Sequence, residues 1–133
     1  MPKVSKESAA NVEDHGGGMV VDRNEDVEGY TIQFLTFNAA ADGTPLLKGL
    51  PGDRCHSPHW GYVFSGRVTY RFEDRDEVFE AGDAFYLPPG HIPIVDAGTE
   101  YVQFSPAEAL HEVSETMTRN FQALMAAAPP ASS

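Results

Sequence analysis

Three histidines and one cysteine lie in two short segments of this chain, and their side chains are the ones most able to do chemistry. Imidazole nitrogen and thiolate sulfur bind zinc and other divalent transition metals, and three nitrogen ligands leave coordination positions open. The candidate metal ligands are His56, His59 and His91, with Cys55 as an additional thiolate. We therefore expect a divalent ion at this site, either zinc, iron, nickel or manganese.

Each of these residues also has a structural explanation. A histidine beside an aromatic residue, as His59 is beside Trp60, is often a hydrogen-bonded structural residue. Cys55 is explained more simply as a small buried hydrophobic residue, because no base stands beside it in the sequence. His15 and His111 are most simply solvated. The sequence leaves open whether the three candidate histidines converge on one ion.

The segment that ends at His91 has the features of a strand followed by a stiff bend. Residues 84–87 are aromatic and aliphatic, as in a half-buried strand, and the Gly-Asp pair before them forms a turn. The Pro-Pro-Gly sequence at 88–90 then ends the pairing, because proline lacks a backbone N–H and glycine accepts a positive φ. The rigid bend is therefore predicted to fix the backbone position of His91.

The other segment, residues 52–66, is a polar loop that leads into an apolar strand. Side chains along a strand alternate between its two faces, so His59 should point inward together with Gly61 and Val63. Small residues beside the histidine would leave space for an organic ligand. Low cation content and many aromatic residues favour a small apolar or aromatic ligand, held by one polar atom.

These two segments resemble the paired motifs of the cupin superfamily over about residues 45–105. The first family motif runs Gly, His-x-His, Glu, Gly, and the second runs Gly, Pro-x-Gly, His. Gly82, Pro88 and Gly90 match the second motif, and residues 62–66 match the end of the first. The resemblance implies an all-β double-stranded β-helix, a jelly-roll barrel, and a homodimer such as single-domain members often form.

The metal-ligand positions of that family fall on other residue types in this chain. The His-x-His pair aligns with Asp53 and Cys55, the glutamate with His59, and the last histidine with Pro93. His91 lies two positions before Pro93 on the same strand face, so it can reach the same cavity from a shifted position. The resemblance thus implies a small cupin-type barrel with a degenerate ligand motif.

Short alternating segments separated by turn signals also predict an all-β domain. The expected strands cover residues 30–34, 67–72, 78–79, 84–87, 91–95 and 100–104. Four regions are expected along the chain: a flexible arm over 1–18, the barrel over 19–105, an amphipathic helix over 106–127 and a frayed tail over 128–133. The arm is rich in glycine and polar residues, so it should be either mobile or an edge segment ordered by docking.

A change of period predicts the C-terminal helix. Ser105 and Glu108 form a capping box around Pro106, which suits the first position of a helix. An apolar stripe then recurs at steps of three and four residues: Leu110, Val113, Met117, Phe121 and Leu124. We expect this stripe to pack on the barrel or on a partner subunit, because the polar face lacks the cations of membrane-binding helices.

Composition excludes several classes of function. The 133 residues suit one domain, with 41% hydrophobic and 11% aromatic residues. Twenty acidic against nine basic residues give a formal charge of −11, which opposes binding to nucleic acid or to anionic membranes. A single cysteine excludes an internal disulfide, and no leader or long apolar span is evident, so we expect a cytoplasmic protein.

Two classes of function stay open at this point. The chain could be a metal-dependent enzyme, such as an oxygenase, isomerase or cyclase, in which the ion polarises a substrate oxygen. Alternatively, it could be a metal-free, non-catalytic module that binds or senses a small molecule. We favour the metal-binding pocket, with a small-molecule ligand and a homodimeric assembly.

Overall fold

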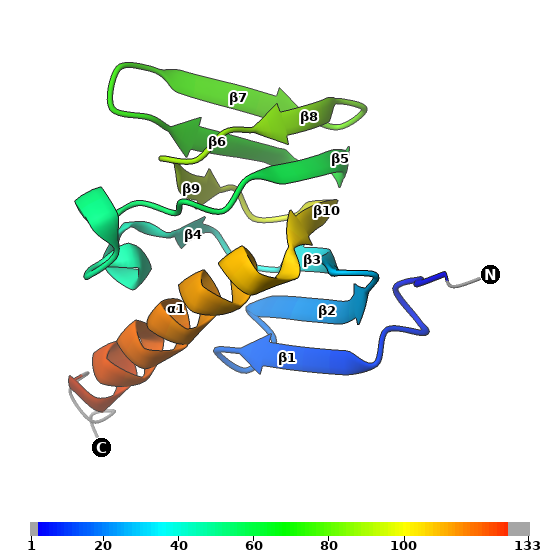
Figure 1. Ribbon diagram of the computed structural model, residues 1–133, viewed down its shortest axis with the longest axis horizontal. Coiled ribbons are helices and arrows are strands. Elements are labelled where there is room, and N and C mark those ends of the chain that lie inside the picture. The colour runs from blue at the N-terminus through cyan, green and yellow to red at the C-terminus, as the bar shows by residue number, and fades with distance from the viewer. Residues whose placement is uncertain (1–2, 128–133) are drawn as a thin grey trace.

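The computed structural model describes residues 3–127, which form two antiparallel sheets and a C-terminal helix (Figure 1). The larger sheet has the strand order β1-β2-β3-β10-β5-β8, and the smaller sheet the order β4-β9-β6-β7. The larger sheet contains β1 Asn11–His15, β2 Val20–Val27, β3 Tyr30–Phe37, β10 Thr99–Pro106, β5 His59–Ser65 and β8 Ala84–Leu87. The smaller sheet contains β4 Ala41–Asp42, β9 Ile92–Val95, β6 Arg67–Arg71 and β7 Asp76–Glu80.

The predicted all-β class with a C-terminal helix is confirmed. The period-two pattern that begins at Tyr30 continues through β3, whose side chains alternate between buried and more exposed positions. Strand β5 behaves in the same way, with His59 and Val63 buried and Trp60 exposed. Two short 3-10 turns, η1 Thr44–Leu47 and η2 Pro51–Asp53, connect β4 to the loop before β5.

The hydrophobic core lies between the inward faces of the two sheets. Val63, Val68 and Leu87 are fully buried there. Phe79 of β7 stacks on Phe85 of β8 with ring centroids 5.2 Å apart. Burying a side chain of this size contributes about 1.5–3 kcal/mol, so this layer fixes the spacing of the sheets that hold the site.

Part of the expected N-terminal arm forms an edge strand. Residues of β1 pair antiparallel with β2, from Asn11 opposite Asn24 to His15 opposite Val20. Lys6, before the strand, forms an ion pair with Glu100 of β10. The arm therefore extends the larger sheet at the edge furthest from β8.

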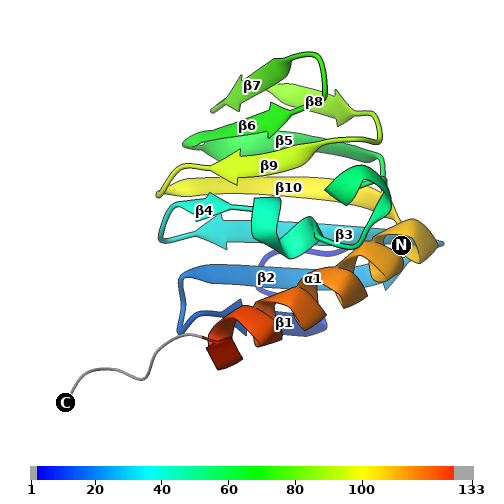
Figure 2. The same cartoon turned by 90° about the vertical axis from the view of Figure 1, so that its left-hand side faces the viewer.

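The helix α1 spans Ala107–Ala127 and lies in front of β1 and β2 in the view of Figure 2. Leu110 and Val113 are its buried residues, and Val113 joins Leu47 and Cys55 in a second apolar cluster. The first half of the expected stripe thus packs on the barrel in this chain, whereas Leu124 is 47% exposed. The predicted tail over 128–133 lies outside the described residues. No helix within residues 3–127 has the length and hydropathy to cross a membrane.

Candidate metal centre

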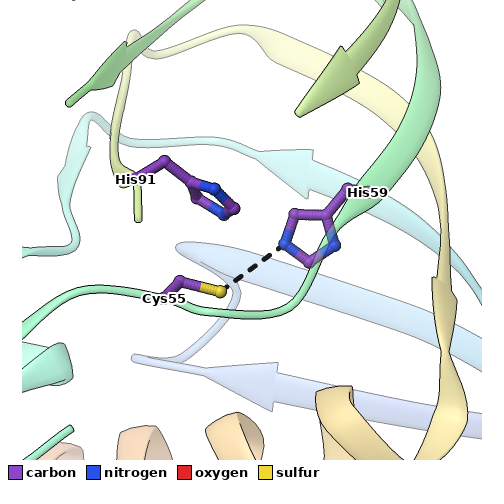
Figure 3. A group of neighbouring side chains, drawn as sticks. All are labelled: Cys55, His59 and His91. Atoms are coloured by element: carbon purple, nitrogen blue, oxygen red, sulfur yellow. Dashed lines mark hydrogen bonds between the residues drawn. The ribbon is translucent and has the colours of Figure 1, made fainter. Parts of the chain in front are cut away.

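Cys55, His59 and His91 meet inside the barrel, and Figure 3 shows their side chains pointing toward one another. One donor atom from each residue lies within 4.8 Å of the other two, and all three residues are buried. The two imidazole centroids are 4.9 Å apart. The donors come from the loop before β5, from the first residue of β5 and from the bend before β9, so the fold brings distant parts of the chain together.

Backbone hydrogen bonds hold the cysteine and one histidine beside each other. The Cys55 N–H donates to the His91 carbonyl at 2.9 Å, and the Gly90 N–H donates to the Cys55 carbonyl at 2.8 Å. Gly90 has φ of 100°, a left-handed conformation that glycine adopts without strain. The bend that the Pro-Pro-Gly sequence predicted therefore aims His91 at the cluster.

The second ring nitrogen of each histidine is occupied by an oxygen outside the cluster. Nδ1 of His91 donates to the Pro88 carbonyl at 2.9 Å, because a carbonyl can only accept. Nδ1 of His59 lies 2.6 Å from the Ser105 hydroxyl oxygen, and Nε2 of the same ring lies 3.6 Å from Sγ of Cys55. Metal-binding histidines usually have their other nitrogen held in this way, which orients the free lone pair.

Burial keeps the cluster uncharged in the absence of an ion. It lowers the pKa of His59 to about 3 and that of His91 to about 4, so both rings are neutral near neutral pH. Burial also raises the pKa of the Cys55 thiol to about 11. A bound cation would favour the thiolate, since metal binding displaces the proton of a coordinating thiol.

The chemistry of this donor set fits a divalent metal. Two neutral imidazoles and a thiol form a mixed nitrogen and sulfur set, which suits zinc, iron or nickel better than manganese, an ion that prefers oxygen ligands. The oriented Nδ1 contacts of His59 and His91 fit the same interpretation. Three protein ligands would leave at least one coordination position for a ligand.

The structure places His56 away from this cluster. Its side chain is exposed and its Nε2 lies 2.6 Å from the Pro51 carbonyl oxygen, so this histidine is held against η2. Cys55 takes the third place that the sequence analysis gave to His56. A signal for Cys55 was present in the sequence, because alternation extended back from His59 puts position 55 on the same inward face.

Of the four positions at which the family resemblance expects metal ligands, two hold members of the cluster. Cys55 and His59 occupy these two, and His91 supplies its ring from two residues before Pro93. Asp53 is exposed, and its carboxylate accepts a hydrogen bond from the Gly49 N–H at 3.0 Å. Pro93 lies in β9 opposite Tyr70.

Ser105 is a site residue that the sequence analysis assigned to another role. Its hydroxyl contacts His59 rather than the start of α1, which begins two residues later at Ala107. The antiparallel pairing of β10 with β5 brings Phe104 opposite Trp60, and this register carries Ser105 to the level of His59. The capping-box pattern assigned Ser105 a local role at the helix start. The sequence did not reveal its contact with His59, because that contact depends on strand register, which is a property of the folded sheet.

A cavity of about 380 Å³ adjoins the cluster and extends toward α1. The cluster residues line it together with Tyr70 and Gln103. Gly61 does not provide its space as expected, since a Cβ at that position would collide with the Phe85 ring and the Val102 carbonyl. The absent side chain at 61 instead allows Phe85 to pack against β5.

No family model matches the sequence, and no curated protein matches it. Solved structures do match. An RmlC-like cupin from Shewanella frigidimarina NCIMB 400 is 20% identical with a TM-score of 0.55, covering 77% of this chain and 88% of that chain. KdgF from Halomonas sp. is 17% identical with a TM-score of 0.51, covering 72% of this chain and 86% of that chain. The chain has the cupin fold.

The cupin resemblance expected from the sequence motifs is thus confirmed. The iron(II) protein HppE has the same fold at 5% identity, with a TM-score of 0.55, 79% of this chain covered and 60% of that chain. At these identities the likeness establishes the fold alone. The chemistry has to be argued from the residues of this chain.

Proposed function

We propose that this cupin-fold protein binds one divalent metal ion through Cys55, His59 and His91, and a small organic ligand in the adjoining cavity. The observation that carries the proposal is the convergence of three donor atoms within 4.8 Å, with both histidines oriented through their other nitrogens. The ion would act as a Lewis acid toward a ligand oxygen at its open position. HppE, a protein of the same fold, is described with iron(II).

The chain's own residues would prepare the site before any ligand arrives. Ser105 and Pro88 fix the ring orientations of His59 and His91, and the backbone bridge between Cys55 and His91 fixes their separation. Leu47 and Val113 pack with the cysteine in one apolar cluster on the side of α1. Oxygenase, isomerase and cyclase chemistry can each use a metal ion with an open coordination position.

Metal content tests the proposal. Protein purified without a polyhistidine tag is equilibrated with zinc, iron, nickel and manganese in turn and analysed for bound metal. We expect about one ion per chain, a loss of binding in Cys55→Ala, His59→Ala and His91→Ala, and full binding in the matched control His56→Ala. Wild-type protein that stays metal-free in every case would overturn the proposal.

One contact supports a second candidate, a metal-free module that binds or senses a small molecule. Sγ of Cys55 already contacts Nε2 of His59 at 3.6 Å, so the cluster is held together without an ion. The same metal analysis separates the two candidates. Under this alternative, the cavity ligand would bind equally well before and after treatment with a chelator.

We further propose a cytoplasmic homodimer that binds neither nucleic acid nor membranes. The formal charge of −11 opposes contact with phosphates, and the exposed aromatic side chains of β5 favour a second subunit. Sedimentation and gel-shift assays test these two parts separately.

A further inference from the structure

The cavity contains a buried hydroxyl group whose hydrogen bonding is incomplete. Tyr70 of β6 is only 2% exposed, and its hydroxyl has no well-formed hydrogen bond within residues 3–127, although the Tyr101 side chain lies beside it. Its ring contacts the His91 ring, with centroids 5.4 Å apart and nearly perpendicular planes. A buried polar group without a good partner costs about 1–3 kcal/mol, and a ligand oxygen that reached this hydroxyl would remove that cost.

Several other polar groups of the cavity are paired with one another. Nε2 of Gln103 donates to Oε1 of Gln33 at 2.7 Å, and Nε2 of Gln33 donates to Oδ2 of Asp22 at 2.9 Å. Nδ2 of Asn24 donates to the other oxygen of Asp22 at 3.1 Å. This chain of amides runs from β10 through β3 to β2, and it satisfies both carboxylate oxygens.

The charge of the cavity wall disfavours an anionic ligand. Glu13, Asp22 and Asp42 line the cavity, whereas no lysine or arginine does so in the part of the chain that the structure describes. A buried anion without a cationic partner is costly. A cation buried beside the cluster is also disfavoured, because Glu13 and Asp42 are exposed to solvent and the buried Asp22 oxygens already accept amide hydrogen bonds.

Most of the cavity wall on and around α1 is apolar, although Ser114 and Thr118 add hydroxyl groups to it. The apolar side chains there include Met19, Leu46, Met117, Phe121 and Leu124. An apolar chain or ring can lie against these residues while a polar atom reaches the deep end. The volume of about 380 Å³ is within the usual range of small-molecule pockets.

We propose that the ligand is an uncharged carbonyl compound or alcohol whose oxygen accepts a hydrogen bond from the Tyr70 hydroxyl. Its apolar chain or ring lies toward α1. This ligand proposal shares with the proposed function only the assumption that the cavity takes an organic ligand. Because it does not require the metal ion, the binding experiments use metal-free protein. Its failure is then distinct from a failure of metal binding.

Three probes of nearly equal shape test the charge of the ligand. They are 4-phenylbutan-2-one, which is neutral, 3-phenylpropanoate, which is an anion, and 4-phenylbutan-2-amine, which is a cation near neutral pH. Affinities are measured by titration with detection of protein amide shifts in NMR spectra. We expect the ketone to bind at least about tenfold more tightly than either charged probe, because each charge would be buried unpaired.

Removal of one hydroxyl tests the residue. Tyr70→Phe should weaken ketone binding about threefold to tenfold, which corresponds to one hydrogen bond. Thermal stability should stay the same or rise, since the hydroxyl has no well-formed hydrogen bond in the free protein. Tyr86→Phe is the matched control, because Tyr86 is 50% exposed on the outer face of the larger sheet. It should bind the ketone as the wild type does.

Three results would overturn the proposal. The first is a charged probe that binds as tightly as the ketone. The second is unchanged ketone affinity in Tyr70→Phe, which would show that the hydroxyl does not hold the ligand. The third is metal-free wild-type protein that binds none of the three probes, although the same preparation takes up metal when an ion is added.

Discussion

At the scale of single residues, the two buried histidines make the stability of the metal-free protein depend on pH. Both have pKa values lowered by burial, to about 3 for His59 and about 4 for His91. In the unfolded chain a histidine titrates near 6.5, so below that pH the unfolded state binds more protons than the folded state. The stabilising contribution is complete above about pH 6.5 and is lost as the pH falls toward 4.

His91→Gln should therefore flatten this dependence. In metal-free protein we expect the free energy of unfolding of the wild type to fall by about 2 kcal/mol between pH 7 and pH 5 through His91 alone. The variant should not show this part of the loss. Urea unfolding in the presence of a chelator measures the free energy at each pH. His56→Gln, which changes an exposed histidine, serves as the control and should retain the wild-type slope. Equal slopes in wild type and His91→Gln would contradict the prediction.

Ser105 acts on the proposed ion through His59. Ser105→Ala removes the oxygen that lies 2.6 Å from Nδ1 of His59, so the ring loses its fixed orientation. We expect metal affinity to fall about 10-fold to 100-fold, as is typical when the partner of a ligating histidine is lost. Competition with a chromophoric chelator measures the affinity.

The control for this change is Ser57→Ala. Ser57 is equally buried, but its hydroxyl donates to the Pro58 carbonyl at 3.2 Å rather than to a histidine. Its metal affinity should stay within about twofold of the wild type. An equal loss in both variants would show that Ser105 supports the fold in general rather than His59 in particular.

At the scale of elements, the bend before β9 controls the geometry of the cluster. Gly90 has φ of 100° and its N–H donates to the Cys55 carbonyl, so the bend positions two of the three donors. Gly90→Val forces a β-branched residue into this conformation at a cost of about 1–3 kcal/mol. We expect the loss in the free energy of metal binding to be larger than the loss in the free energy of unfolding.

Gly82→Val is a matched control for the bend. Gly82 has φ of 95° in the turn between β7 and β8, and a Cβ there meets open space, as it does at Gly90. Both variants introduce the same backbone strain, but only one of them adjoins the cluster. If both lower metal affinity equally, the bend has no special role in aiming His91.

At the scale of the whole molecule, the outer face of the larger sheet exposes aromatic side chains. Trp60, Tyr62 and Phe64 of β5 are 44%, 42% and 49% exposed, and Tyr86 lies 5.1 Å from Trp60 between ring centroids. Strand alternation places this stripe on the face opposite His59, and in this chain neither the N-terminal strand nor α1 buries it. Aromatic surface of this extent favours a second subunit.

Phe64→Glu should dissociate the proposed homodimer, because a carboxylate in an apolar interface would be buried without a partner. Sedimentation velocity should then show a species of half the mass. Val78→Glu, on β7 of the smaller sheet, changes an equally exposed apolar residue and should leave the assembly intact. A wild-type protein that sediments as a monomer would exclude the dimer.

The sequence alone was enough to predict the features that depend on local backbone chemistry. Alternation with period two predicted the strands and the inward direction of His59, because a strand fixes side-chain directions residue by residue. The Pro-Pro-Gly sequence predicted the bend at Gly90, whose positive φ is a property of that residue. The charge and the cupin-like motifs likewise needed no knowledge of distant contacts.

The tertiary structure alone decided which donors meet. The loop at η2 turns His56 toward the Pro51 carbonyl and leaves Cys55 in the cluster, a choice that loop geometry makes and strand periodicity cannot. Register between β10 and β5 brought Ser105 to His59, and packing of Phe85 filled the space at Gly61. These contacts join residues far apart in the chain, and pairing and close packing fix them only when the whole barrel forms.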